Sequence, residues 1–244
     1  MKNILYLLIL AVLLVFGCSE NDANITPSRA GKGGSMARFA ISGNYLYSVS
    51  NSKLNLFNII DTHHPVKEKS LSVGWGIETI YPYKNYLFMG SQTGMYIYNN
   101  TDPANPEFLS NYQHIFSCDP VVVDDNYAYI TLRDGSSCRQ GDNRLEIVDI
   151  KDLTNPQLKK SYNMTNPYGL GIDQNKLFVC DDGLKVYDAT DPLNLQLLKH
   201  FEINAYDVIP DNGRLSVIGS DGFYQYSYSG SEITFLSKLA LPNQ

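Results

Sequence analysis

The sequence predicts an all-β protein built from repeated four-stranded antiparallel sheets. A twelve-residue phrase occurs in full at 145–156 (LEIVDIKDLTNP) and returns in altered form at 56–65, 95–106 and 184–195. Its aromatic or β-branched centre recurs at intervals of 41, 50, 39 and 39 residues, at Phe57, Tyr98, Val148, Tyr187 and Tyr226. Each unit alternates with period two, carries Asn, Asp, Gly and Pro at turn spacing, and shows no helical periodicity. A period near forty with four strands per unit indicates a five-bladed β-propeller of four-stranded antiparallel blades.

Each unit supplies its four strands in the same order. The innermost strand is expected to be apolar on both faces, as are 39–42, 78–82, 120–124, 169–173 and 207–211. A second strand follows a turn in every unit, at 44–49, 85–90, 126–131, 175–180 and 213–218. The phrase is the third strand, and alternating runs such as 157–162 and 233–239 suit an outer strand with one solvated face. Because units one and five each hold four strands, we expect whole blades and a ring closed by contact between the first and last blades.

The second half of the phrase is expected to form turns rather than a metal site. Aspartates recur there at Asp61, Asp102, Asp152 and Asp191. An Asx side chain caps a turn by itself, and one carboxylate per blade spreads these groups around a rim, too far apart to share an ion. His63 and His64 are neighbours in an extended stretch, so they point to opposite sides. No metal and no cofactor are therefore expected.

The amino terminus predicts export and lipid anchoring. Lys2 precedes an apolar run at 4–16 that is too short to span a bilayer, so 1–17 is interpreted as a signal peptide. The end of this segment, VFGC, resembles the lipobox of bacterial lipoproteins, which implies that Cys18 becomes the acylated (palmitate-bearing) mature N-terminus. An ordinary signal peptide with an incidental Cys18 is the alternative. The polar stretch 18–35 is expected to be a flexible tether, and 36–244 the propeller.

The expected location is the cell envelope, lipid-anchored at the outer membrane, with the periplasmic and surface faces left open. The chain has 244 residues, 43% of them hydrophobic, and a formal net charge of −6. Nucleic-acid binding is disfavoured, because its affinity comes from clustered Lys and Arg, and no such cluster is present. The expected partners are the membrane, reached through the N-terminal lipid, and a glycan or an envelope protein.

The repeats also carry a family resemblance. The segments 145–156, 207–219 (DVIPDNGRLSVIG) and 121–131 (VVVDDNYAYIT) resemble the LVIVD repeat of bacterial surface and secreted propeller proteins. The resemblance is strongest in unit three and weakest in units one and five. Unit five departs most, because YSGSE (228–232) replaces its Asp-rich turn. It implies a propeller fold and an envelope location, and it supplies no catalytic residues.

The candidate ligand site lies on the face that holds the connections between blades. Aromatic rings with carboxylates and Arg at a funnel mouth are typical of a ligand site, and this face contains Trp75, Glu78, His114, Asp119, Arg133, Arg139, Tyr168, Tyr206 and Asp207. The alternative is that these residues only complete a polar surface and plug the axial channel. The favoured function is a non-catalytic binding or scaffold module. A carbohydrate-active hydrolase or lyase using Glu78, Asp119 and Asp207 is the second hypothesis, because carboxylates ~5–10 Å apart would permit glycosidic chemistry.

The cysteines predict one disulfide. An oxidising envelope permits bridges, and Cys118 and Cys138 are expected on one face of one blade, Cys138 within the long insertion at 133–143. Cys180 ends an apolar strand and suits a small buried side chain. Two unpaired thiols, or a bridge to Cys180, are the alternatives.

Overall fold

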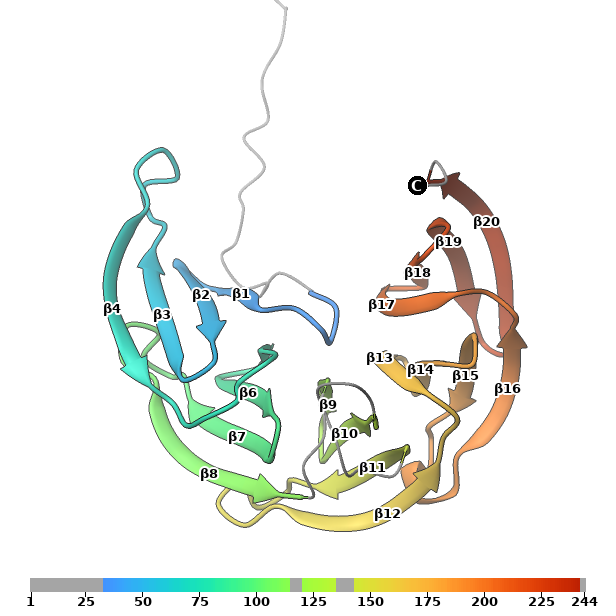
Figure 1. Ribbon diagram of the computed structural model, residues 1–244, viewed down its shortest axis with the longest axis horizontal. Helices are drawn as coiled ribbons and strands as arrows, with labels where there is room; N and C mark the ends of the chain where they lie inside the picture. The colour runs from blue at the N-terminus through green and yellow to red at the C-terminus, as the bar shows by residue number, and fades with distance from the viewer. Residues whose placement is uncertain (1–32, 115–119, 135–142, 242–244) are drawn as a thin grey trace, which may run out of the picture.

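The computed structural model describes residues 33–114, 120–134 and 143–241. They form five four-stranded antiparallel sheets arranged around an axis (Figure 1). The first sheet contains β1 (Phe39–Ser42), β2 (Tyr45–Ser50), β3 (Lys53–Asn58) and β4 (Val66–Ser72). The second contains β5 (Tyr81–Tyr83), β6 (Tyr86–Ser91), β7 (Gly94–Asn99) and β8 (Glu107–Gln113).

The third sheet contains β9 (Val121–Asp124), β10 (Tyr127–Leu132), β11 (Arg144–Asp149) and β12 (Gln157–Asn163). The fourth contains β13 (Pro167–Asp173), β14 (Lys176–Asp181), β15 (Leu184–Asp188) and β16 (Gln196–Phe201), with a short 3₁₀ turn η1 (Pro192–Asn194) before β16. The fifth contains β17 (Ala205–Asp211), β18 (Arg214–Gly219), β19 (Gly222–Ser229) and β20 (Glu232–Ala240). Every sheet uses four consecutive strands, so the predicted five whole blades are confirmed.

The phrase forms a strand followed by two Asx turns. In the third blade, Asp149 Oδ1 accepts the Lys151 N–H at 3.0 Å, and Asp152 Oδ1 accepts the Thr154 N–H at 2.9 Å. The aspartates of the other three phrases also accept a backbone N–H two residues on, at His63, Ala104 and Leu193. The capping prediction is therefore confirmed. Within the described ranges, no three His, Cys, Asp or Glu side chains are grouped so as to hold a metal ion.

A bulge at the same place in every blade makes the repeats comparable residue by residue. The pairing of the third and fourth strands shifts register directly after Leu56, Ile97, Ile147, Val186 and Gln225. These five residues are therefore structurally equivalent. Their second-strand partners, Tyr47, Phe88, Tyr129, Phe178 and Ser216, are equivalent as well.

Four hydrophobic clusters hold consecutive blades together. One lies between the first and second sheets, and the next three join the second to the third, the third to the fourth and the fourth to the fifth. Each cluster contains one buried aromatic ring from its earlier blade, in the order Tyr47, Phe88, Tyr129 and Phe178. Blade packing therefore depends on one large aromatic ring from each of the first four blades.

The ring is open between its first and last blades, so the predicted closure by contact between them is wrong. Figure 1 shows the sheet of β1–β4 and the sheet of β17–β20 on either side of an opening. Among the residues the structure describes, no hydrophobic cluster joins these two sheets. The two ends of the ring are instead linked at the axis, where the N-terminal segment 33–36 contacts the fifth blade.

We call this contact the clasp: residues 33–36 together with Asp207 on β17. The Ser35 hydroxyl donates to Asp207 Oδ1 at 3.1 Å and accepts the Leu170 N–H of β13 at 2.8 Å. The Met36 N–H donates to Asp207 Oδ2 at 3.3 Å. The clasp thus connects the start of the first blade to blades four and five. Gly33–Ser35, assigned to the tether from sequence, are part of the folded molecule, and Ser35 is buried.

Several sequence predictions fall outside the described residues. They concern the signal peptide, Cys18 and the tether up to residue 32, and also the Cys118–Cys138 bridge, which stays a prediction. Cys180 is a free, buried cysteine, as expected. None of the helical turns in the described ranges is long and apolar enough to cross a membrane.

Candidate functional site

Three of the predicted ligand residues come together on the face of the inter-blade connections. The Arg133 guanidinium, just after β10, lies 4.2 Å from the centre of the Tyr168 ring on β13. That ring lies 5.7 Å from the ring of Tyr206 on β17. The Thr131 hydroxyl donates to the Tyr168 carbonyl at 2.7 Å and fixes this strand entry. The result is a row of one cation and two mutually tilted rings, with a cation–π contact at one end and the exposed Tyr206 at the other.

Asp207 is beside this row in sequence but has a structural role. Its carboxylate accepts the Ser35 hydroxyl and the Met36 and Val208 N–H groups. Burial raises the pKa of Asp207 to about 6, and these hydrogen bonds offset part of that effect. Both oxygens are thus engaged by the clasp, and the carboxylate is withdrawn from the channel mouth.

The remaining candidates are dispersed. Trp75 is exposed in the connection between the first two blades, and Glu78 accepts the Gln92 side-chain amide at 3.0 Å. The His114 ring lies 6.0 Å from the Tyr112 ring at the end of β8. Asp119 and Arg139 lie outside the described residues. The sequence therefore located one cluster correctly, but it did not identify a single shared site.

The axis of the ring is filled rather than open. The space there is about 20 Å³, lined by inner-strand residues including Tyr81, Val122, Leu170 and Val208, and by Gly33 of the clasp. Burial raises the pKa of Tyr81 above its ordinary range. Among the described inner-strand residues, the axis therefore holds no open channel of the kind expected behind a funnel mouth.

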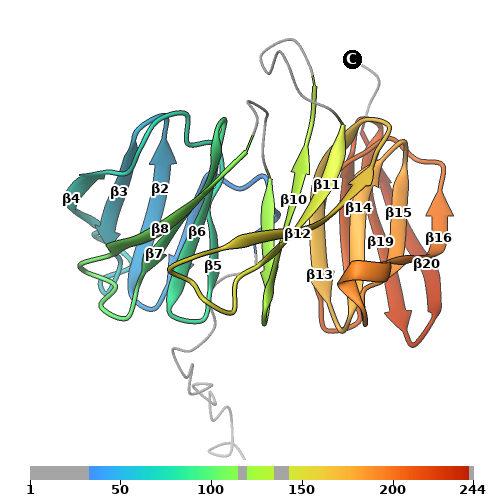
Figure 2. The ribbon, with the colours of Figure 1, turned by 90° about the horizontal axis from the view of Figure 1, so that it is seen from below.

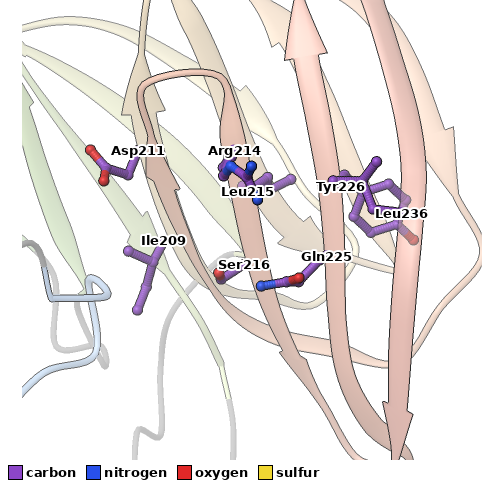
Figure 3. Close-up of a pocket in the computed structure, with 8 residues that line it drawn as sticks. All are labelled: Ile209, Asp211, Arg214, Leu215, Ser216, Gln225, Tyr226 and Leu236. Atoms are coloured by element: carbon purple, nitrogen blue, oxygen red, sulfur yellow. The ribbon is translucent and has the colours of Figure 1, made fainter. Parts of the chain in front are cut away.

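A larger hollow, of about 340 Å³, lies on the fifth blade (Figure 3). Asp211 and Arg214 stand at one end of it and Ser216 and Gln225 at the other, while Ile209 and Leu236 give it apolar walls. The volume is within the ~300–1,000 Å³ range of ligand pockets. None of these residues was predicted as a site residue.

The hollow faces the opening of the ring. Ile209, Ser216 and Gln225 are directly paired across β17, β18 and β19, so their side chains share one face of the sheet. The other face carries Val208, Val217 and Tyr224, which belong to the cluster shared with the fourth blade. The face with the hollow is thus the one that would meet a following blade.

The hollow exists because the fifth blade lacks the residues that fill the other interfaces. Ser216 is equivalent to the four buried aromatic residues of blades one to four. Gln225 is equivalent to Leu56, Ile97, Ile147 and Val186, which are all buried. A ring and an aliphatic side chain are thus replaced by a hydroxyl and an amide. The substitution of Ser216 is visible in the aligned repeats, and this is the signal that sequence reasoning missed.

Comparison with known proteins supports the fold and the repeat. The LVIVD repeat model matches residues 117–164. No curated protein matches the chain. A protein from Lactobacillus plantarum superposes with a TM-score of 0.63 at 14% identity, covering 82% of this chain and 69% of its own. A functionally unknown protein from Desulfotomaculum acetoxidans DSM 771 gives a TM-score of 0.61 at 13% identity, covering 85% and 68%.

The computationally designed Ika8 protein gives a TM-score of 0.57 at 13% identity, covering 82% of this chain and 60% of the designed one. The present chain thus spans about three fifths of that chain's length. At these identities the likeness concerns the fold alone, and it agrees with the five sheets described above. The five sheets show that this chain is a β-propeller, and its residues 117–164 match the LVIVD repeat.

Proposed function

We propose that this protein is a lipid-anchored β-propeller of the cell envelope that acts as a non-catalytic binding module, with its ligand in the opening between the fifth and first blades. The observation that carries the proposal is the replacement of the interface aromatic by Ser216, which leaves a hollow of about 340 Å³. In the first four blades the equivalent residue is buried against the next blade. A face with a polar hollow suits a ligand better than a dry blade interface, because buried polar groups must be hydrogen-bonded.

Among the described residues, the geometry gives no support to the hydrolase or lyase alternative, whose third carboxylate, Asp119, lies outside them. Asp207, its best-placed carboxylate, is engaged by Ser35, Met36 and Val208. Glu78 accepts a hydrogen bond from Gln92 in another connection. The hollow itself contains one carboxylate, Asp211, whereas glycosidic chemistry uses a pair. Binding without catalysis is therefore the function we propose.

The envelope location rests on the leader and the tether. The short apolar run before VFGC suits an exported lipoprotein, and two acyl chains are enough for stable anchoring. A polar tether would hold the propeller away from the lipid surface. The partner is then a glycan or a protein of the envelope.

The hollow can be tested by filling it. Ser216→Phe restores the ring that the first four blades have at this position, and should block the site while leaving the fold intact. We expect full-length wild-type protein to retain envelope glycans or proteins in a pull-down, and the variant to lose them. Lys160→Ala, an exposed change on the outer strand of the third blade, is the control. Equal retention by wild type and Ser216→Phe would contradict a site in the opening.

A further inference from the structure

The wall across the opening has the same pattern as the wall with the hollow. On the fifth blade, Ser216, Gln225 and Ser237 form a direct cross-strand row next to Ile209. On the first blade, the corresponding row is Ser48, Asn55 and Ser70, next to Phe39. Each wall thus presents an amide between two hydroxyls, beside an apolar side chain.

The first blade is also modified at its centre. Ser48 is equivalent to Met89, Ile130, Val179 and Val217, which are fully buried in the other blades. Its position on the first blade faces the opening rather than a preceding blade. In both walls, serine therefore stands where the other blades have a buried apolar residue.

The polar side chains are arranged to offer donors and acceptors together. The Ser237 hydroxyl donates to Gln225 Oε1 at 3.4 Å, which orients the amide. On the other wall, the Ser70 hydroxyl donates to Asn55 Oδ1 at 2.7 Å, and the Asn55 amide donates to the Ser48 carbonyl at 3.4 Å. Side-chain amides and hydroxyls can each donate and accept. These walls therefore suit a ligand that carries many hydroxyl groups.

Charge and apolar surface narrow the ligand class. Asp211 and Arg214 pair directly across β17 and β18, so the charged end of the hollow has no net charge. Apolar side chains border both rows, and Phe39 is 63% exposed and Leu239 69% exposed. Such surfaces pack against the C–H faces of sugar rings, while the amides and hydroxyls bind their hydroxyl groups. At this end of the hollow, an anionic ligand would meet no excess of positive charge.

We infer that the opening binds a neutral oligosaccharide, held by the Ser216–Gln225–Ser237 row and assisted by the Ser48–Asn55–Ser70 row. This inference rests on the proposed binding function and specifies its ligand. An extended peptide fits less well, because strand addition uses the unpaired edge of a sheet, whereas the opening presents the side chains of two sheet faces.

The test uses an array of neutral oligosaccharides, acidic oligosaccharides and peptides, probed with the full-length chain. We expect neutral sugars to bind. Gln225→Leu and Ser216→Phe should each weaken this binding by at least about tenfold, because they remove the amide or fill the hollow. Asn55→Leu should weaken it by a smaller factor. Gln113→Leu, the same chemical change at an exposed position on β8, should have no effect.

The outcomes separate the ligand class from the proposed function. Binding of acidic sugars or peptides that Ser216→Phe abolishes would overturn the neutral-sugar inference and keep the opening as the binding site. Neutral-sugar binding that neither Ser216→Phe nor Gln225→Leu changes would overturn the site. No binding to any neutral sugar would reject the inference, and the envelope pull-down would then decide the proposed function.

Discussion

At the scale of single residues, Asp207 differs from the aspartates of the repeated phrase. The phrase aspartates cap exposed turns, and hydrogen bonds from their own turns hold the pKa of Asp61, Asp102 and Asp152 below the ordinary value. Asp207 is buried, and its pKa is raised to about 6. The pKa of the Cys180 thiol on β14 is raised, first by burial and then by the negative charge of Asp207. The pKa of an aspartate is thus lowered in the turns at the rim and raised at the axis.

Asp207 should give the protein a defined pH dependence. A folded pKa of about 6, above the ~3.9 of an unfolded aspartate, means that the folded state binds the proton more tightly. The free energy of unfolding should therefore gain up to about 2–3 kcal/mol from this group as pH falls from above 6 to below 4. Asp207→Asn keeps an acceptor without the charge and should remove this gain.

The measurement is urea unfolding of both proteins between about pH 7.5 and about pH 4.5. Carboxylates with lowered pKa values contribute less to the free energy of unfolding as the pH becomes acidic. The difference between wild type and Asp207→Asn is therefore the informative quantity. We expect the wild type to gain stability relative to the variant as the pH falls, because only the wild type takes up a proton at this position. Parallel curves would show that Asp207 is not perturbed.

At the scale of elements, the clasp replaces a blade interface. It depends on two glycines that lie far apart in sequence: a Cβ at Gly34 or at Gly169 would fall inside the Asp207 carboxylate. Ser35 bridges β13 and β17 through one hydroxyl that donates to one strand and accepts from the other. A segment without strand structure thus makes the axial link between the ends of the ring.

Gly34→Ala should open the clasp. The added methyl group cannot fit beside Asp207, so Ser35 and Met36 would lose their acceptor. Hydrogen–deuterium exchange should rise in 33–38 and at the start of β17, and remain unchanged in β10 and β11 of the third blade. Gly33→Ala is the matched control, because its Cβ would lie 3.2 Å from the Ala37 Cβ, a contact that small shifts relieve. Equal exchange in the two variants would refute the clasp as a closing element.

At the scale of the whole molecule, four interfaces hold five blades in an arc. Figure 2 shows the sheets standing side by side, and Figure 1 shows the inner strands such as β9, β13 and β17 nearest the axis. Each interface is filled by a ring from one blade and aliphatic side chains from the next. The fifth blade has no such ring, so the arc ends in a polar face. The composition of the fifth unit therefore gives the opening its polar wall.

The predicted anchor determines where the molecule sits. Cys18→Ser should abolish acylation, because the thiol that carries the lipid is absent, and membrane attachment through two acyl chains should be lost. Fractionation with metabolic labelling by a fatty acid measures both effects. A change at Ser19 to Ala, next to the acylated residue, should keep the label. Retention of the cleaved Cys18→Ser protein in membranes would contradict the lipid anchor.

The sequence by itself determined what is local and repeated. Strand positions, Asx turns such as those of Asp149 and Asp152, and five units follow from alternation and turn chemistry within about forty residues. The sequence also placed Arg133, Tyr168 and Tyr206 on one face, because residues at equivalent ends of consecutive blades share it, but their contacts come from the structure alone.

Only the tertiary structure decided what depends on the curvature of the ring and on contacts across it. The opening depends on how the four filled interfaces add up around the axis, and no single unit shows that sum. The clasp joins Ser35 to Asp207, 172 residues apart, in a geometry that no repeat predicts. The hollow at Ser216 appears only when a missing ring coincides with a missing neighbour. Local hydrogen bonding therefore fixes the blades, and through-space packing fixes where the ring stays open.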